Sequence, residues 1–127
     1  KAEALRNKRG KEYAAVLKDL ENAHWGSWKK DGAKPFSLIA QEACKFFEVA
    51  PRDLVGRRQT KGVVLARQVV MYLARQYTGL SMPEIGRRLN RDHTTVLHAL
   101  RKIEGKLFDE PGFAKDIARL RDRIDGS

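Results

Sequence analysis

The chain is 127 residues long, which fits one domain with a modest hydrophobic core, and its formal net charge is +10. So strong a positive charge favours a polyanionic partner. A single cysteine, Cys44, excludes an intrachain disulfide framework, and its apolar neighbours predict a buried thiol. The sequence has no signal peptide and no apolar run of 18 residues, so we expect no membrane association.

Residues 1–34 are predicted to form a helical extension followed by a linker. Apolar residues recur at helical spacing between residues 10 and 25, and Gly26, Asp31-Gly32 and Pro35 mark the linker. The apolar positions are Tyr13, Val16, Leu17, Leu20 and Trp25, and Trp28 follows them. Three partners remain open for this helix: the rest of the chain, a second copy in a homodimer, or another protein. Residues 35–127 are expected to form the main domain.

The main domain is predicted to be all-α, a compact multi-helix domain. Ser37 is expected to cap a helix that ends at Phe47. Residues 63–77 are apolar almost all round, which marks a central buried helix, and Gly79 ends that helix. A closing helix is predicted from the i, i+4, i+7 and i+11 repeat of Phe113, Ile117, Leu120 and Ile124.

Residues 81–107 have the pattern of a short helix, a tight turn and a longer helix. Ser81 and Glu84 have the spacing of a capping box, with Pro83 in the first turn. Asn90 begins a polar turn, and Asp92 is a suitable N-cap for the next helix. The pattern is typical of a helix-turn-helix, although an ordinary αα-hairpin would share it.

The longer helix is predicted to have an apolar face and a polar face. The apolar face is formed by Val96, Leu100, Ile103 and Leu107, and the polar face by Thr94, His98, Arg101 and Lys102. Hydroxyl, imidazole and cationic groups can contact base edges and phosphates in the major groove of DNA. The helix is therefore predicted to be a recognition helix.

The same residues resemble a known family. The run LSMPEIGRRLNRDHTTVLHALRKIE, preceded by ARQVVMYLARQYTG, is similar to the C-terminal DNA-binding domain of the bacterial replication initiator DnaA. The resemblance extends over roughly residues 36–124 and implies a helix-turn-helix fold like that of TrpR and of domain IV of DnaA. In that family a basic loop enters the minor groove, while the recognition helix and the turn before it contact the major groove of a short asymmetric box.

Matching residue by residue implies two groups of DNA contacts. The major-groove group is Pro83, Arg91, Asp92, His93, Thr94, Thr95 and His98. The phosphate or minor-groove group is Arg57, Arg58, Gln59, Lys61, Arg67, Arg101 and Lys102.

The chain also departs from the family pattern at several positions. The family's basic loop corresponds to residues 57–68, and Gln59 stands where the family has its minor-groove arginine. Leu65 and Ala66 replace other basic or rigid positions, and Asn90 stands where the family often has two glycines. These departures bear on the base preference rather than on DNA binding itself.

Neither catalysis nor metal binding is expected. His93 and His98 lie five residues apart, so on a helix they point about 140° away from each other and cannot bind one ion together. The sequence contains no G-x-x-x-x-G-K-[ST] loop. We therefore expect no metal, no cofactor and no enzyme activity, and a DnaA-type domain without the family's ATPase module.

The favoured function is sequence-specific binding of double-stranded DNA by a cytoplasmic, nucleoid-associated regulator of transcription or replication. Two alternatives stay open. One is a DNA-binding fragment of a larger replication initiator or mobile-element protein, and the other is a protein- or RNA-interaction module that kept the fold. The polar face of the longer helix favours DNA, because the deep, narrow major groove of RNA would not admit it.

Overall fold

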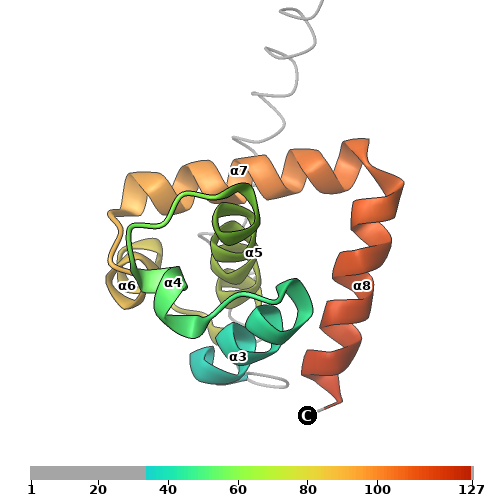
Figure 1. Ribbon diagram of the computed structural model, residues 1–127, viewed down its shortest axis with the longest axis horizontal. Coiled ribbons are helices and arrows are strands. Elements are labelled where there is room, and N and C mark those ends of the chain that lie inside the picture. The colour runs from blue at the N-terminus through green and yellow to red at the C-terminus, as the bar shows by residue number, and fades with distance from the viewer. Residues whose placement is uncertain (1–33, 127) are drawn as a thin grey trace, which may run out of the picture.

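Residues 34–126 are described by a computed structural model, and in this part of the chain every regular element is a helix (Figure 1). The helices are α3 (Phe36–Phe47), α4 (Pro51–Val55), α5 (Lys61–Thr78), α6 (Met82–Arg88), α7 (His93–Asp109) and α8 (Pro111–Asp125). The prediction of an all-α domain is confirmed. The predicted N-terminal helix, with Trp25 and Trp28, lies outside the described residues.

Helix α5 is the centre of the domain, and α3, α4, α6 and α7 pack against it (Figure 1). Every residue from 69 to 77 is buried, which explains the nearly continuous apolar sequence of this helix. The helix ends at Gly79, whose φ of 73° places it in the left-handed region that glycine adopts without steric cost. The predicted central helix and its end are confirmed.

Helices α7 and α8 form two sides of a frame around α5 (Figure 1). A break at Glu110-Pro111 separates them, because proline begins a helix well but cannot continue the one before it. The predicted closing helix is confirmed, since Phe113, Ile117, Leu120 and Ile124 are all buried. Helix α8 packs against both α3 and α7 and so closes the core.

Helix α3 begins earlier than predicted. Its N-cap is Pro35, whose extended backbone precedes a helix that starts at Phe36, so the exposed Ser37 already lies inside the first turn. The prediction that Ser37 caps this helix is wrong. Cys44 is buried, as predicted, and burial and the nearby charge of Asp53 raise the pKa of its thiol.

No helix of residues 34–126 combines the length and the apolar character needed to cross a membrane.

Candidate nucleic-acid interface

Helix α6 begins with the capping box that the sequence predicts. The Ser81 hydroxyl accepts a hydrogen bond from the Glu84 backbone N–H at 3.3 Å, and the Glu84 carboxylate accepts one from the Ser81 N–H at 3.0 Å. These contacts with Ser81 lower the pKa of the Glu84 carboxyl. Pro83 lies exposed in the first turn, where its missing N–H costs no helical hydrogen bond.

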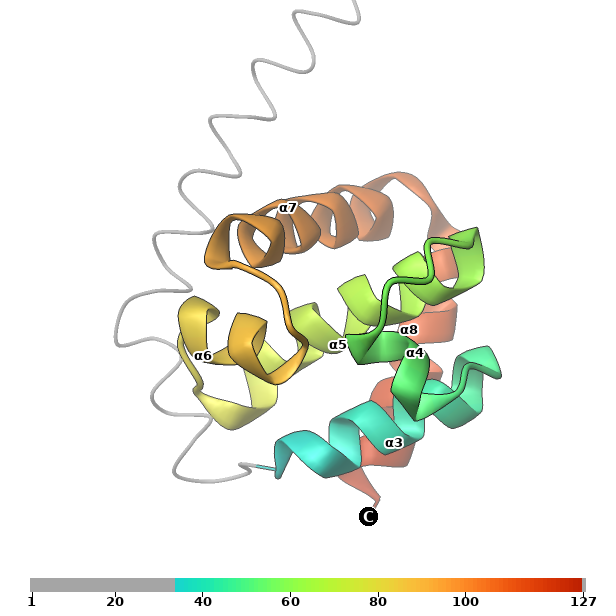
Figure 2. The same ribbon diagram turned by 60° about the vertical axis from the view of Figure 1, so that its left-hand side comes forward.

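The turn between α6 and α7 is tight because of two residues. An ideal Cβ at Gly86 would lie 2.4 Å from the Arg91 carbonyl oxygen, so only glycine lets the chain pass this close. The Arg91 N–H then donates to the Gly86 carbonyl at 2.7 Å. Asn90 has φ 58°, a left-handed conformation that asparagine tolerates better than most residues. Figure 2 shows the result, with α6 beside the first turns of α7.

Asp92 caps α7, as predicted. Its carboxylate accepts from the Thr95 backbone N–H at 2.9 Å and from the Thr95 hydroxyl at 3.1 Å. These hydrogen bonds lower the pKa of the Asp92 carboxyl. Thr95 is thus part of the cap as well as part of the polar face.

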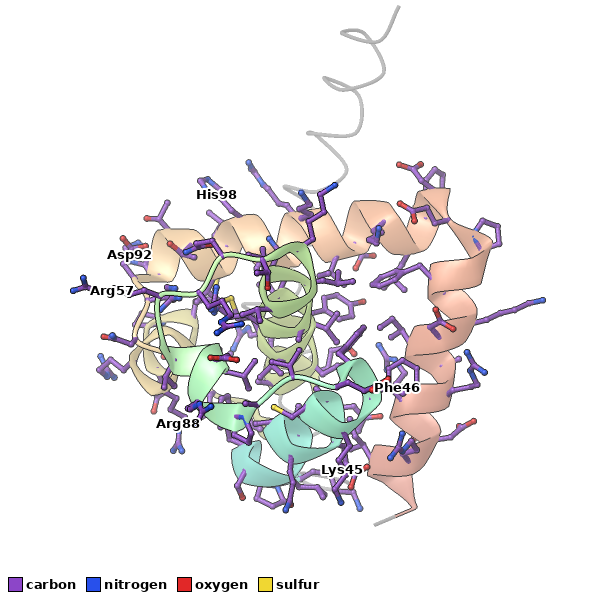
Figure 3. The ribbon with its side chains drawn as sticks, viewed as in Figure 1. Lys45, Phe46, Arg57, Arg88, Asp92 and His98 are labelled. Atoms are coloured by element: carbon purple, nitrogen blue, oxygen red, sulfur yellow. The ribbon has the colours of Figure 1, made fainter. Side chains whose placement is uncertain are left out.

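Helix α7 has the two faces that its sequence pattern predicts. Val96, Ala99, Leu100 and Ile103 are buried against the core. The exposed residues are His93, Thr94, Thr95, His98, Arg101 and Lys102. In Figure 3, Asp92 lies at the start of α7 and His98 on its outer edge. The arrangement leaves the polar face free to enter a groove.

The segment that corresponds to the family's basic loop, residues 57–68, is a loop only in its first part. Helix α5 begins at Lys61, slightly before the predicted start of the central helix at residue 63, so the loop between α4 and α5 is residues 56–60. Arg57, Arg58 and Gln59 are exposed in this loop, and Lys61 is exposed in the first turn of α5. Ala66 belongs to the core, which explains why a basic residue is absent there.

Arg67 is not on the surface, and the prediction that it contacts DNA is wrong. The residue is only 4% exposed. Its Nε donates to the Leu54 carbonyl at 2.8 Å, and its Nη2 donates to the carbonyls of Asp53 at 2.8 Å and Arg58 at 3.0 Å. Burial and the nearby charge of Arg91 lower its pKa, while Asp53 acts in the opposite direction. The buried Arg67 side chain therefore connects α5 to the end of α4 and to the loop by hydrogen bonds.

Arg91 is half-buried and contacts the protein backbone on two sides of the turn. Its Nη1 donates to the carbonyls of Leu89 at 3.1 Å and Asn90 at 3.0 Å, and its Nη2 donates to the Gly56 carbonyl at 2.6 Å. The last bond joins the loop to the helix-turn-helix. In Figure 3, Arg57 of the loop and Asp92 of the turn lie on the same side of the molecule.

Residues 36–103, which include α3 to α6 and more than half of α7, match the family described as the bacterial DnaA protein helix-turn-helix. The chain belongs to this family. A DnaA-type helix-turn-helix is a DNA-binding element and not a catalytic one. The predicted helix-turn-helix is confirmed, in place of an ordinary αα-hairpin. Helix α8 lies beyond the matched residues and completes the core of the domain.

Curated DnaA proteins show the same relationship. The chain is 42% identical over 89 residues to the chromosomal replication initiator protein DnaA of Caldanaerobacter subterraneus subsp. tengcongensis, which is 70% of this chain and 20% of the relative. It is 48% identical over 84 residues to the DnaA of Bartonella quintana, 65% of this chain and 17% of that protein. For the DnaA of Levilactobacillus brevis the identity is 42% over 112 residues, 87% of this chain and 24% of that protein. The chain therefore spans about a fifth of the length of these relatives.

Proposed function

We propose that the protein binds double-stranded DNA with sequence preference, as a DnaA-type replication or transcription regulator at the nucleoid. Helix α7 and the turn before it would lie in the major groove, and the loop 56–60 would lie against the neighbouring minor groove. The main support for the proposal is the exposed polar face of α7, which is the second, N-capped helix of a DnaA-family helix-turn-helix.

The chemistry of the exposed face supports contact with bases. Thr94 offers a hydroxyl and a methyl group, and His98 offers ring nitrogens that donate or accept. Base pairs present distinct donors, acceptors and methyl groups in the major groove, so these side chains can discriminate between sequences. Pro83, Asp92 and His93 are also exposed, at the start of α6 and of α7. We propose them as further major-groove contacts, together with Thr95 and the half-buried Arg91.

The exposed cations support contact with the DNA backbone. Arg57, Arg58 and Lys61 lie in or next to the loop, and Arg101 and Lys102 lie further along α7. Phosphate contacts of this kind fix the register of the protein on the duplex and carry no direct base information. Gln59 brings hydrogen-bonding groups but no charge to the loop, so we propose a weaker preference for narrow A·T-rich minor grooves than an arginine would give.

Selection from a pool of random duplexes, followed by titration of variants, tests this function. Thr94→Ala and His98→Ala should each cost about 1–3 kcal/mol on the selected site and much less on random DNA. Thr95→Ala is a less clean test, because its hydroxyl also contacts the cap residue Asp92. Lys61→Ala should weaken both duplexes evenly. Equal affinity of the wild-type protein for all duplexes at physiological salt would refute sequence preference.

A role in replication is the more strongly supported of the two regulatory roles. The relatives described above are named chromosomal replication initiator proteins. Mapping of the bound sites on the chromosome would test it, since a replication role predicts sites gathered at one locus and a transcription role predicts sites at many promoters. Competition with duplex RNA tests whether the protein is instead an RNA-binding module. Duplex RNA would release such a module from labelled DNA as readily as unlabelled DNA does.

A further inference from the structure

The loop between α4 and α5 is held by arginine side chains from two different elements. Arg67 of α5 donates to the carbonyls of Asp53, Leu54 and Arg58. Arg91, in the turn of the helix-turn-helix, donates to the carbonyl of Gly56. The carbonyls of Gly56 and Arg58, on either side of Arg57, therefore accept hydrogen bonds from Arg91 and Arg67. The side chain of Arg57 remains exposed.

The two arginines have different consequences for the loop. The carbonyls of Asp53 and Leu54 lie in the last turn of α4, where no helical partner is available, so Arg67 terminates α4 and ties it to α5. The Arg91–Gly56 bond instead spans 35 positions of sequence and connects the loop to the element that carries α7. Arg91 also donates to Leu89 and Asn90 in its own turn, which fixes the position of its guanidinium group.

We propose that Arg91 is a positioning residue that sets the distance between the loop and α7 before DNA is bound. This inference rests on the proposed function, in which the loop and α7 contact two adjacent grooves. A loop fixed in this way accepts only one separation between its minor-groove contact and the major-groove contacts of α7. The protein would then distinguish DNA sites by the spacing of their two ends as well as by their bases.

This positioning role requires arginine rather than lysine at residue 91. The planar guanidinium of Arg91 donates to carbonyls on both sides at once, whereas a lysine ammonium is a single point on a flexible stem. Arg91→Lys keeps the positive charge and much of the apolar stem but loses the planar group that donates in two directions. The substitution therefore separates positioning from charge.

The test measures Kd for two duplexes. One is the duplex selected by the wild-type protein, and the other has one base pair inserted between the minor-groove contact of the loop and the major-groove contacts of α7. A misplaced loop contact changes Kd by about 5- to 150-fold, so we expect the insertion to weaken the wild-type protein about 100-fold. In the Arg91→Lys variant, binding to the selected duplex should weaken about tenfold, and the inserted base pair should weaken it only about tenfold more. The control Arg87→Lys, at an exposed arginine of α6, should keep the wild-type ratio.

A second measurement needs no DNA and separates this inference from the proposed function. Backbone order parameters of Gly56 and Arg57 should be about 0.85 in the wild-type protein and fall below about 0.6 in Arg91→Lys, while those of Arg58, which Arg67 still holds, and of α5 stay unchanged. Unchanged order parameters would overturn the inference even if the protein binds DNA as proposed. A wild-type protein with no sequence preference but with the expected change in loop order would refute the proposed function and leave the Arg91 contact supported.

Two further results would overturn the assignment. In the first, Arg91→Lys has the same ratio of Kd with and without the inserted base pair as the wild-type protein, but no longer discriminates at one particular base pair. Arg91 would then contact that base pair directly. If Arg91→Lys does not fold, Arg91→Gln, which can still donate to one carbonyl, replaces it in both measurements. If neither variant folds, Arg91 is required for the fold itself and is not a positioning residue.

Discussion

Gly86 shows at the scale of one residue how the helix-turn-helix turn is built. A side chain there would meet the backbone of Arg91, with only 2.4 Å between an ideal Cβ and the carbonyl oxygen. Gly112 offers a matched control, because it also lies in a helix and nothing stands within 4 Å of its Cβ position. We expect Gly86→Ala to lower the free energy of unfolding by about 1–3 kcal/mol through forced backbone shifts. Gly112→Ala should be neutral or raise it by about 0.4–1 kcal/mol. Urea denaturation of both variants checks the contrast, and similar values for the two would refute it.

Asn90 is the other residue that the turn constrains. Its φ of 58° lies in the left-handed region, which a β-branched side chain disfavours strongly. Asn90→Val should lower the free energy of unfolding by about 1–2 kcal/mol. Asn90→Gly should stay within about 0.5 kcal/mol of the wild-type protein, because glycine has no Cβ to clash. Denaturation curves of both variants test this, and a valine variant as stable as the glycine variant would contradict the assigned conformation.

The errors of sequence-based prediction also arise at the scale of single residues. Arg67 and Arg57 are both cations near one loop, but the first is buried and the second exposed. Nothing in the spacing shows this difference, because it depends on which carbonyl groups of α4 and the loop lack partners. Ser37 was a plausible cap by residue type, but the helix begins before it, at Phe36.

At the scale of the element, the cap of α7 makes stability depend on pH. The hydrogen bonds from Thr95 lower the pKa of the Asp92 carboxyl. A carboxyl with a lowered folded-state pKa contributes stability that is present above its unfolded pKa and is lost as the pH falls through the folded one. Asp92→Asn keeps an oxygen acceptor but does not titrate, so we expect the wild-type protein to lose stability more steeply below about pH 4.

Denaturation of both proteins at several pH values between neutrality and acid checks this expectation. Glu84→Gln provides a parallel case, because the contacts with Ser81 lower the pKa of the Glu84 carboxyl in the same direction. The two substitutions should each flatten the acid side of the stability curve. Curves for wild type and Asp92→Asn that run parallel down to low pH would show that the cap contributes nothing that titrates.

The elements that could be predicted best are those whose signals are local. The capping box of α6 and the N-cap of α7 involve residues three positions apart, so the sequence reveals both partners. The start of α5 has no such signal. Thr60 is the N-cap of α5, but its side chain makes no capping hydrogen bond, and basic residues occur both before and after it. The central helix therefore begins at Lys61, slightly before the start at residue 63 that its apolar sequence predicts.

At the scale of the whole molecule, the burial pattern was predictable and the polar links between distant helices were not. The apolar repeats of α5, α7 and α8 place the core correctly. Within α5, Gln76 donates to the Tyr72 hydroxyl at 3.3 Å. The same side chain also accepts a hydrogen bond from Arg121 of α8, 45 positions away. No sequence spacing indicates a contact at that separation. The Gln76–Arg121 hydrogen bond therefore joins the closing helix to the central one, in addition to the apolar core that the two helices share.

The charge of the whole molecule supplies the last prediction. In Figure 1, α6 and the start of α7 lie on one side of α5 and α8 lies on the other, so we expect only some of the exposed cations to reach one duplex. Arg57 is exposed in the loop, whereas Arg119 is exposed on α8 beside Asp116. Each phosphate contact contributes about −0.9 to the slope of log K against log salt concentration, so Arg57→Ala should make the slope shallower by about 0.9. Arg119→Ala should leave it unchanged, although the two variants have the same net charge. Titrations at several salt concentrations would measure both slopes, and equal changes would mean that the net charge of the protein, rather than one DNA-binding side, determines its affinity.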